Sequence, residues 1–108
     1  MAACLLAGCH TLGTRGAFAG CQAADTGTTL YAKEHGAREL NPVVDAIMTA
    51  GGPAAFVAVK LGVTLLVVHE YAVLSRDFVA VASGISCAAA ANNVNVARRL
   101  AAEEKARR

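Results

Sequence analysis

The stretch FVAVASGISCAAAANNVNVA, residues 78–97, runs for 20 residues without a charged side chain. An α-helix of that length rises about 30 Å, the hydrocarbon thickness of a typical bilayer. The whole chain has the same character, because hydrophobic residues make up 56% of its 108 residues and charged residues only 17%. So few charges cannot coat so much apolar surface on a small protein, and the excess is expected to face lipid or a partner.

Two further spanning helices are predicted upstream, over residues 17–33 and 54–74. Both are largely apolar, but Asp25 interrupts the first and Lys60 the second. Residues 57–68 are rich in β-branched side chains, which favour strands in water. A lone strand in lipid leaves its backbone groups unpaired, so a helix is predicted there as well.

A short interfacial helix over residues 43–50 is predicted between these two segments. Asn41 can cap its free amide groups, and Pro42 loses no hydrogen bond in the first turn. Glu39 marks the water-facing connection that precedes it, and a glycine pair at 51–52 ends it. The predicted fold is all-α: a small helical membrane bundle of about three spanning helices plus one short interfacial helix.

The basic C-terminal tail orients this bundle. Residues 98–108 follow the membrane domain of residues 17–97 and hold five of the ten Lys and Arg residues. Positive charge favours the cytoplasmic side, so three crossings place the C-terminus inside and the N-terminus outside, with a bacterial inner membrane as the expected location. The lipid membrane is the expected partner. Nucleic acid is not, because no second basic face or aromatic platform accompanies the tail.

The N-terminal segment, residues 1–16, contains Leu6-Ala7-Gly8-Cys9, which has the form of a bacterial lipobox. Cys9 is therefore a candidate lipidation site, and the chain a candidate lipoprotein. No basic n-region precedes it, and the apolar run is shorter than that of a working signal peptide. Two interpretations stay open: a truncated lipoprotein signal, and a weakly helical N-terminus that matches by chance.

No catalytic, metal or cofactor site is predicted. The four cysteines show neither C-x-x-C pairs nor metal-ligand spacing, and Cys21 and Cys87 are expected to be buried thiols that behave as small hydrophobes. His69 and Glu70 are expected to form an interfacial pair, because zinc would need further ligands at helical spacing. Enzyme activity is therefore not expected.

Polar side chains are predicted to meet at one depth in the membrane. Counting 1.5 Å per residue puts Asp25 about 12 Å and Lys60 about 10 Å from the cytoplasmic boundary. Asn92 and Asn93 lie about 8 Å from it, and Asn92 is the one assigned to the cluster. Helical spacing adds further hydroxyls to the same faces, namely Thr28 and Thr29 beside Asp25, and Thr64 beside Lys60.

This cluster supports two hypotheses. An Asp25–Lys60 ion pair could relay protons, bind an ion or hold a small polar ligand, since ionisable groups inside membranes are costly and often functional. Alternatively it locks the three helices together. A third geometry has Lys60 extending to the interface to meet Glu39 or Asp45.

Ala80, Gly84 and Ala88 repeat at four-residue spacing. Such a stripe of small residues lets helix backbones approach closely. It could mediate packing within the chain, or contact with a second copy or a membrane protein partner.

The order of several motifs resembles a group of small, uncharacterised bacterial membrane proteins. These carry D-x-x-T-T, G-x-x-E-x-N-P and K-L, matched here by residues 25–29, 36–42 and 60–61. The resemblance implies a multi-helix membrane protein in which Asp25, Glu39, Asn41 and Lys60 belong to one design. It brings no established activity.

The sequence therefore favours a small integral membrane protein with a structural or partner-binding, accessory role. The alternatives are a small channel or holin-like oligomer, a lipid-anchored lipoprotein, and a soluble helical dimer.

Overall fold

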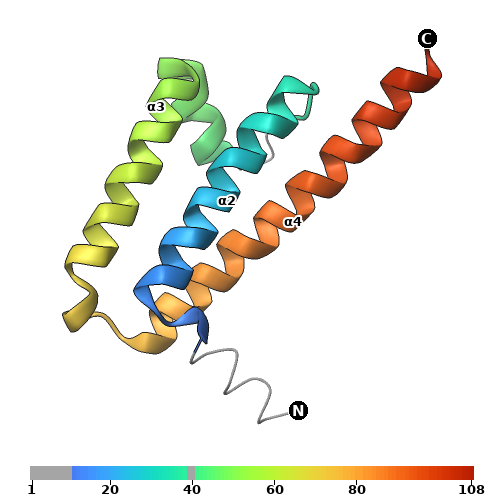
Figure 1. Ribbon diagram of the computed structural model, residues 1–108. Helices are drawn as coiled ribbons and strands as arrows, with labels where there is room; N and C mark the ends of the chain where they lie inside the picture. The colour runs from blue at the N-terminus through green and yellow to red at the C-terminus, as the bar shows by residue number, and fades with distance from the viewer. Residues whose placement is uncertain (1–10, 39–40) are drawn as a thin grey trace.

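Three long helices dominate the computed structural model, which describes residues 11–38 and 41–108. They are α2 (Arg15–Glu34), α3 (Pro42–His69) and α4 (Arg76–Ala106), with a 3-10 turn, η1 (Tyr71–Val73), between the last two (Figure 1). No strand occurs in these two stretches, so the all-α prediction is confirmed. The lipobox-like motif ending at Cys9, and Glu39, lie outside the described residues.

Each long helix begins at a polar capping side chain. Thr14 accepts a hydrogen bond from the backbone N–H of Ala17 at 3.1 Å, and Ser75 accepts one from Phe78 at 3.0 Å. Asn41 accepts one from Val43 at 2.9 Å, as expected for a residue that precedes Pro42. These bonds satisfy amide groups that have no partner within the helix, and so they fix where each helix begins.

The helix expected over residues 43–50 forms the first part of α3. Gly52 has φ 74° and ψ −171°, a conformation that kinks α3 between its first turns and the long apolar part that starts at Pro53. Only glycine adopts this backbone region readily. The far end differs from the prediction, because α3 ends at His69 rather than near residue 74 and η1 makes the turn into α4.

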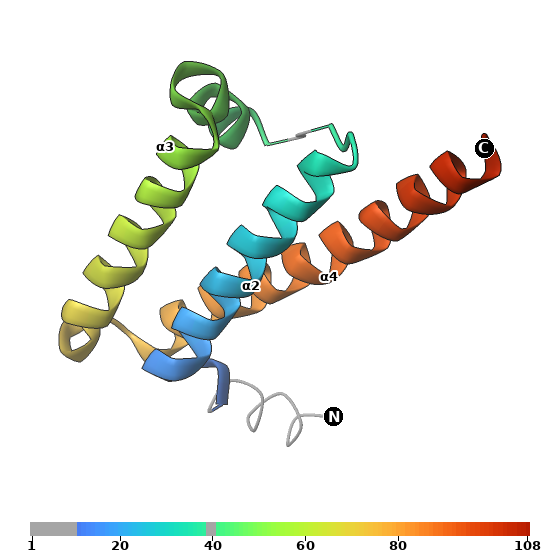
Figure 2. The ribbon, with the colours of Figure 1, turned by 45° about the horizontal axis from the view of Figure 1, so that its top comes forward.

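α2 lies between the other two helices and runs parallel to α4 but antiparallel to α3 (Figures 1 and 2). It packs most extensively on α4 and more sparsely on α3. Among the described residues, no substantial contact joins α3 to α4 directly. The three helices therefore make an open arrangement of 50 × 36 × 20 Å with a groove between α3 and α4.

The seam of α4 against α2 repeats every three or four residues. It consists of Val79, Ser83, Ser86 and Ala90, all of which are buried. Small side chains at this spacing let two backbones approach closely. The fully buried Phe18 of α2 is the largest side chain in the core of this pair.

The stripe predicted from Ala80, Gly84 and Ala88 lies beside this seam rather than on it. Ala80 is buried, Gly84 is half-buried and Ala88 is exposed. A Cβ added at Gly84 would lie 3.8 Å from Leu12 Cδ1, so this part of the stripe faces the chain's own N-terminal region.

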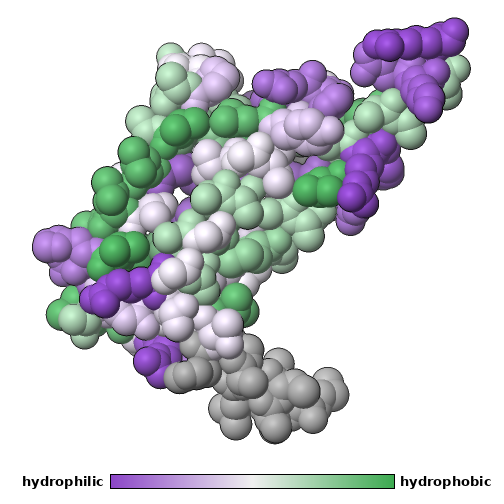
Figure 3. Space-filling model, in the orientation of Figure 1, coloured by the Kyte–Doolittle hydropathy of each residue, from purple (hydrophilic) through white to green (hydrophobic). Residues whose placement is uncertain are grey.

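Large apolar side chains cover the outer surface of α3 (Figure 3). Leu61, Leu65 and Leu66 are 56%, 59% and 62% exposed. In the described part of the chain, α3 and α4 are long and apolar enough to cross a membrane. α2 is less apolar than these two helices. Length and composition therefore support two of the three predicted spans, α3 and α4.

Candidate functional site

An ion pair joins α2 to α3 in the middle of the molecule. Lys60 Nζ lies 2.7 Å from Asp25 Oδ2, close enough for a charge-assisted hydrogen bond. The two side chains are only 19% and 16% exposed. The pair expected from helix depth is therefore present in the structure, and Lys60 does not extend to the interface.

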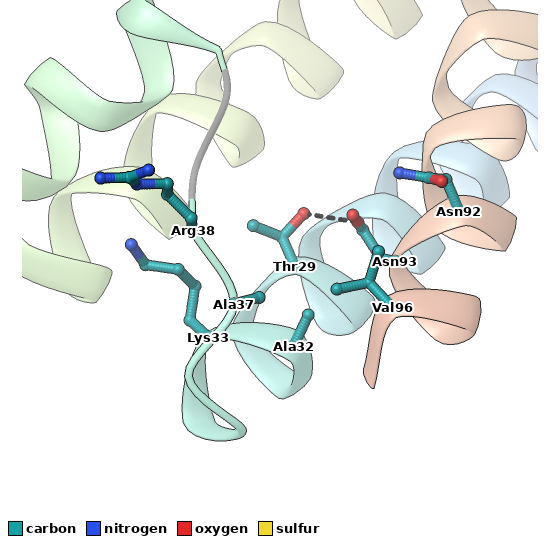
Figure 4. Close-up of a pocket in the computed structure, with 8 residues that line it drawn as sticks. All are labelled: Thr29, Ala32, Lys33, Ala37, Arg38, Asn92, Asn93 and Val96. Atoms are coloured by element: carbon teal, nitrogen blue, oxygen red, sulfur yellow. Dashed lines mark hydrogen bonds between the residues drawn. The ribbon is translucent and has the colours of Figure 1, made fainter. Parts of the chain in front are cut away.

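Asn93 brings α4 into the same cluster. Its Nδ2 donates to Thr29 Oγ1 at 2.9 Å and to Thr28 Oγ1 at 3.1 Å, and lies 3.5 Å from Asp25 Oδ1 (the Thr29 bond is dashed in Figure 4). Thr29 Oγ1 in turn donates to Asp25 Oδ1 at 3.4 Å. One carboxylate thus receives hydrogen bonds from all three helices, and we call Asp25, Thr28, Thr29, Lys60 and Asn93 the polar layer.

Two residues predicted for this cluster lie elsewhere. Asn92 is exposed and lines the small cavity beside the cluster, whereas its neighbour Asn93, which continues the α4 seam, makes the hydrogen bonds to Thr28 and Thr29 (Figure 4). Thr64 shares a helix face with Lys60 but donates to the backbone carbonyl of Lys60 at 2.7 Å. That bond satisfies the hydroxyl within α3 and adds no link between helices.

A second polar contact joins α2 to α4 nearer the start of both helices. Gln22 Nε2 donates to Ser86 Oγ at 2.6 Å, with both residues buried. Gln22 Oε1 and Ser83 Oγ are buried without a hydrogen-bond partner among the described residues. No role is predicted for Gln22 from the sequence, although a glutamine in an otherwise apolar turn is a signal for such a contact.

The prediction of free thiols at Cys21 and Cys87 is wrong, because the two form a disulfide between α2 and α4. Their Cα atoms are 4.8 Å apart, although the cysteines are separated by 66 positions in the sequence. The small residues of the seam bring the backbones this close. Disulfides persist in oxidising compartments such as the bacterial periplasm.

Aromatic and charged contacts join the N-terminal end of α2 to the η1 turn. The guanidinium of Arg15 lies 4.5 Å from the ring centre of Tyr71, and its Nε donates to the carbonyl of Val68 at 3.3 Å. The Tyr71 hydroxyl donates to the carbonyl of Gly13. The predicted interfacial pair at this end is loose and exposed, with His69 Nε2 3.8 Å from Glu70 Oε1.

Besides a mainly apolar space of about 440 Å³ between α2 and α3 that Lys60 also lines, two cavities border the polar layer. One, of about 300 Å³, opens beside the Asp25–Lys60 pair and is lined by all three helices. The other, of about 100 Å³, lies between the end of α2 and α4 and has Lys33 and Arg38 on its rim (Figure 4). Within the described residues, no group of three or more His, Cys, Asp or Glu could hold a metal ion. The site is a hydrogen-bonded layer with adjoining space.

A family model described as "Domain of unknown function (DUF5658)" matches residues 16–95. The chain belongs to the DUF5658 family. The DUF5658 match includes α2, α3 and most of α4, and therefore contains the whole polar layer. The comparisons with curated proteins and with solved structures gave no match.

Proposed function

We propose that the chain is an integral membrane protein of three crossing helices, with a structural or partner-binding, accessory role and no catalytic activity. The exposure of α3 carries this proposal. A core helix of a soluble protein can be equally long and apolar, but it is buried. Only 6% of the most apolar part of α3 is buried within the protein. Lipid is the environment in which such a surface is stable.

Hydrogen bonding within the bundle supports a third crossing by α2. This helix has about 30 Å of length in its 20 residues, enough to span the hydrocarbon layer. The polar side chains of α2 that would cost free energy in lipid face the neighbouring helices. Asp25 contacts Lys60 and Asn93, and Gln22 contacts Ser86. Polar groups satisfied in this way hold membrane helices together.

The distribution of basic residues supports a cytoplasmic C-terminus in a bacterial inner membrane. The end of α2, the start of α3 and the end of α4 share one side of the molecule. Seven of the ten Lys and Arg residues lie on that side, two on the opposite side, and Lys60 lies between them. The seven are Lys33, Arg38, Arg98, Arg99, Lys105, Arg107 and Arg108. Positive side chains favour the cytoplasm.

The disulfide supports the same orientation. Cys21 lies six residues from the first residue of α2, about 9 Å along the helix from the sparsely charged end. That end would face the oxidising periplasm, where a disulfide forms and persists.

Confinement of polar groups to part of the bundle favours a structural role over a channel. A pore needs a polar stripe along its whole length, whereas the outer face of α3 is apolar. The D-x-x-T-T, E-x-N-P and K-L motifs of this chain fit this role, since Asp25 and Lys60 pair while Asn41 caps α3.

Alkaline carbonate extraction of membranes tests this proposal. We expect the chain to stay in the pellet and a C-terminal reporter to be active only in the cytoplasm. Leu65→Arg places a charge on the exposed apolar face of α3 and should lower the pelleted fraction, while Glu104→Arg in the tail should not. Release of the unaltered chain into the supernatant would show that it is not integral.

A further inference from the structure

Lys60 borders two cavities of opposite character. The space of about 440 Å³ between α2 and α3 is almost entirely apolar, with Val57 and Leu61 in its walls. The cavity of about 300 Å³ that α4 also lines is polar, because six of its ten lining residues carry polar side chains. The six are Asp25, Thr29, Asn41, Lys60, Ser86 and Asn93. Apolar cavities stay dry whereas polar ones of sufficient size hold water, so water is expected in the second cavity alone.

The Asp25–Lys60 pair leaves hydrogen-bonding groups that the protein does not fully use. An ammonium group has three N–H donors, and among the described residues Lys60 Nζ donates to Asp25 Oδ2 alone. The other carboxylate oxygen, Asp25 Oδ1, accepts from Thr29 at 3.4 Å and from Asn93 at 3.5 Å, and both bonds are long. The two charged side chains are 19% and 16% exposed, so small molecules reach them. Water supplies the missing partners.

The polar cavity opens toward the proposed cytoplasmic side. Asn41 and Val44 in its wall belong to the N-terminal cap and the first turn of α3, which lie on that side, and Asn41 is exposed. In the opposite direction the cavity meets, at Ile85, a space whose walls are mainly apolar. Water that enters beside Asn41 therefore reaches the ion pair but has no polar lining to follow beyond it.

We propose that the polar cavity is an aqueous half-channel, which opens to the cytoplasm alone and lets Asp25 exchange protons with that side. The volume suffices, because one water molecule needs about 10–15 Å³ of such space and two to four polar partners. In the exchange, the carboxylate takes a proton from a hydronium ion in the cavity and later returns it to water there, while Lys60 keeps its charge. Among the described residues that border this cavity, Lys60 of α3 is the charged group facing Asp25, and α4 presents neutral Ser86 and Asn93. This inference rests on the proposed membrane location.

Cysteine accessibility in oriented membrane vesicles tests the water path. Ala89 lines the polar cavity about 14 Å along α4 from Arg98, whereas its neighbour Ala88 is exposed on another face of the helix. Each is replaced by cysteine in a chain that carries Cys4→Ser and Cys9→Ser, and treated with a charged, membrane-impermeant methanethiosulfonate. In inverted vesicles, which expose the cytoplasmic side, Ala89→Cys should react at least about tenfold faster than Ala88→Cys, although Ala88 is the more exposed residue. Neither should react in right-side-out vesicles.

The outcomes separate this proposal from the membrane location on which it rests. Reaction of both cysteines in both kinds of vesicle would show that α4 does not cross the membrane and would overturn both. Protection of both cysteines would overturn the half-channel and leave the membrane location standing. Reaction of Ala89→Cys from the periplasmic side, with Ala88→Cys protected, would overturn the one-sided opening.

Radiolytic footprinting of the unaltered chain gives the same comparison if a cysteine variant loses the Cys21–Cys87 disulfide. Ile85 lines the polar cavity and is 66% exposed, whereas Val81 is 60% exposed one helical turn away. Hydroxyl radicals form from water, so Ile85 should be oxidised and Val81 should not. Equal oxidation of the two would overturn the proposal.

Carbodiimide labelling tests the proton exchange, because a membrane-permeant carbodiimide reacts with protonated carboxyl groups. Peptide mass spectrometry then reports Asp25 beside two controls, Asp45 in the first turn of α3 and Asp77 in the first turn of α4, which lie at opposite ends of the bundle. While the ionised form predominates, labelling of Asp25 should fall about tenfold for each unit by which the cytoplasmic pH is raised, in parallel with Asp45. It should not change with the periplasmic pH, which Asp77 follows. Labelling of Asp25 that follows Asp77, or that responds to neither side, would overturn the proposal.

Discussion

Replacing Asp25 alone or Lys60 alone should destabilise the bundle, and the two losses should differ in size. Replacing both residues together should restore most of the stability that a single replacement loses. Lys60→Met keeps the length of the side chain but leaves the Asp25 carboxylate with only long contacts, 3.4 Å to Thr29 and 3.5 Å to Asn93. The carboxylate cannot move away, because its side chain is short and lies between three helices.

The magnitudes follow from these geometries. An unpaired Asp in the middle of a membrane helix costs about 2.5–3.5 kcal/mol, so Lys60→Met should lose about 3 kcal/mol. Asp25→Asn keeps an oxygen for Asn93 and leaves an ammonium on a flexible stem that can extend toward the interface. Its loss should be close to that of one interhelical hydrogen bond, about 0.6–1.7 kcal/mol. The double variant should lie within about 1 kcal/mol of the unaltered protein, because neither charge is left unpaired.

A double-mutant cycle in mixed micelles measures this coupling. Dyes on the exposed Val59 and Ala91 report the separation of α3 from α4 by energy transfer as sodium dodecyl sulfate is added. We expect a coupling free energy of about 2–3 kcal/mol between Asp25 and Lys60. Losses that simply add in the double variant would refute a structural lock and favour the hypothesis that one of the two charges serves a separate function.

Three further perturbations should have distinct outcomes. Cys21→Ser or Cys87→Ser should abolish the mobility shift on reduction in gels and lower stability by at most about 4 kcal/mol, the loop-closure value for a separation of 66 residues. Asn93→Ala should lower the unfolding midpoint in dodecyl sulfate, while Asn92→Ala should leave it unchanged, because only Asn93 bonds to Thr28 and Thr29. Gly52→Ala should cost about 1–3 kcal/mol in the same titration, since alanine does not tolerate φ 74°. An unchanged midpoint in Gly52→Ala would show that the kink is not needed.

The depth of a residue along its helix could be predicted from the sequence. The direction in which its side chain points around the helix axis could not be predicted closely enough to choose between neighbouring residues. Rise per residue is constant, so counting from the charged boundaries put Asp25 and Lys60 at the same level, and they pair at 2.7 Å. Neighbouring residues in a helix differ by about 100° in direction, so choosing Asn92 instead of Asn93 selects the wrong face. The same one-residue error separates the predicted stripe at Ala80 from the seam that contains Val79 and Ser83.

The disulfide and the groove depend on how the helices are arranged, which local pattern does not reveal. Cys21 and Cys87 are far apart in the chain, and nothing in their spacing indicates that α2 packs on α4 rather than chiefly on α3. The signal that could have indicated it is the repeat of small residues every three or four positions, Ser83, Ser86 and Ala90, which continues to Asn93. Ser83 and Ser86 on that seam also predict that the helix packed against α4 presents polar side chains to it. α2 does so through Gln22 and Thr29.

The central position of α2 explains how so polar a helix can belong to an apolar bundle. Alone it is not apolar enough to cross a membrane, whereas α3 and α4 are. The Asp25 carboxylate is paired with Lys60 of α3, the Gln22 amide N–H donates to Ser86 of α4, and the Cys21–Cys87 bond fixes α2 to α4 covalently. Insertion of α2 should therefore depend on α3 and α4. In the proposed three-crossing bundle, the polar layer would specify which helices meet and at which depth, because α2 inserted in any other register would leave Asp25 unpaired in lipid.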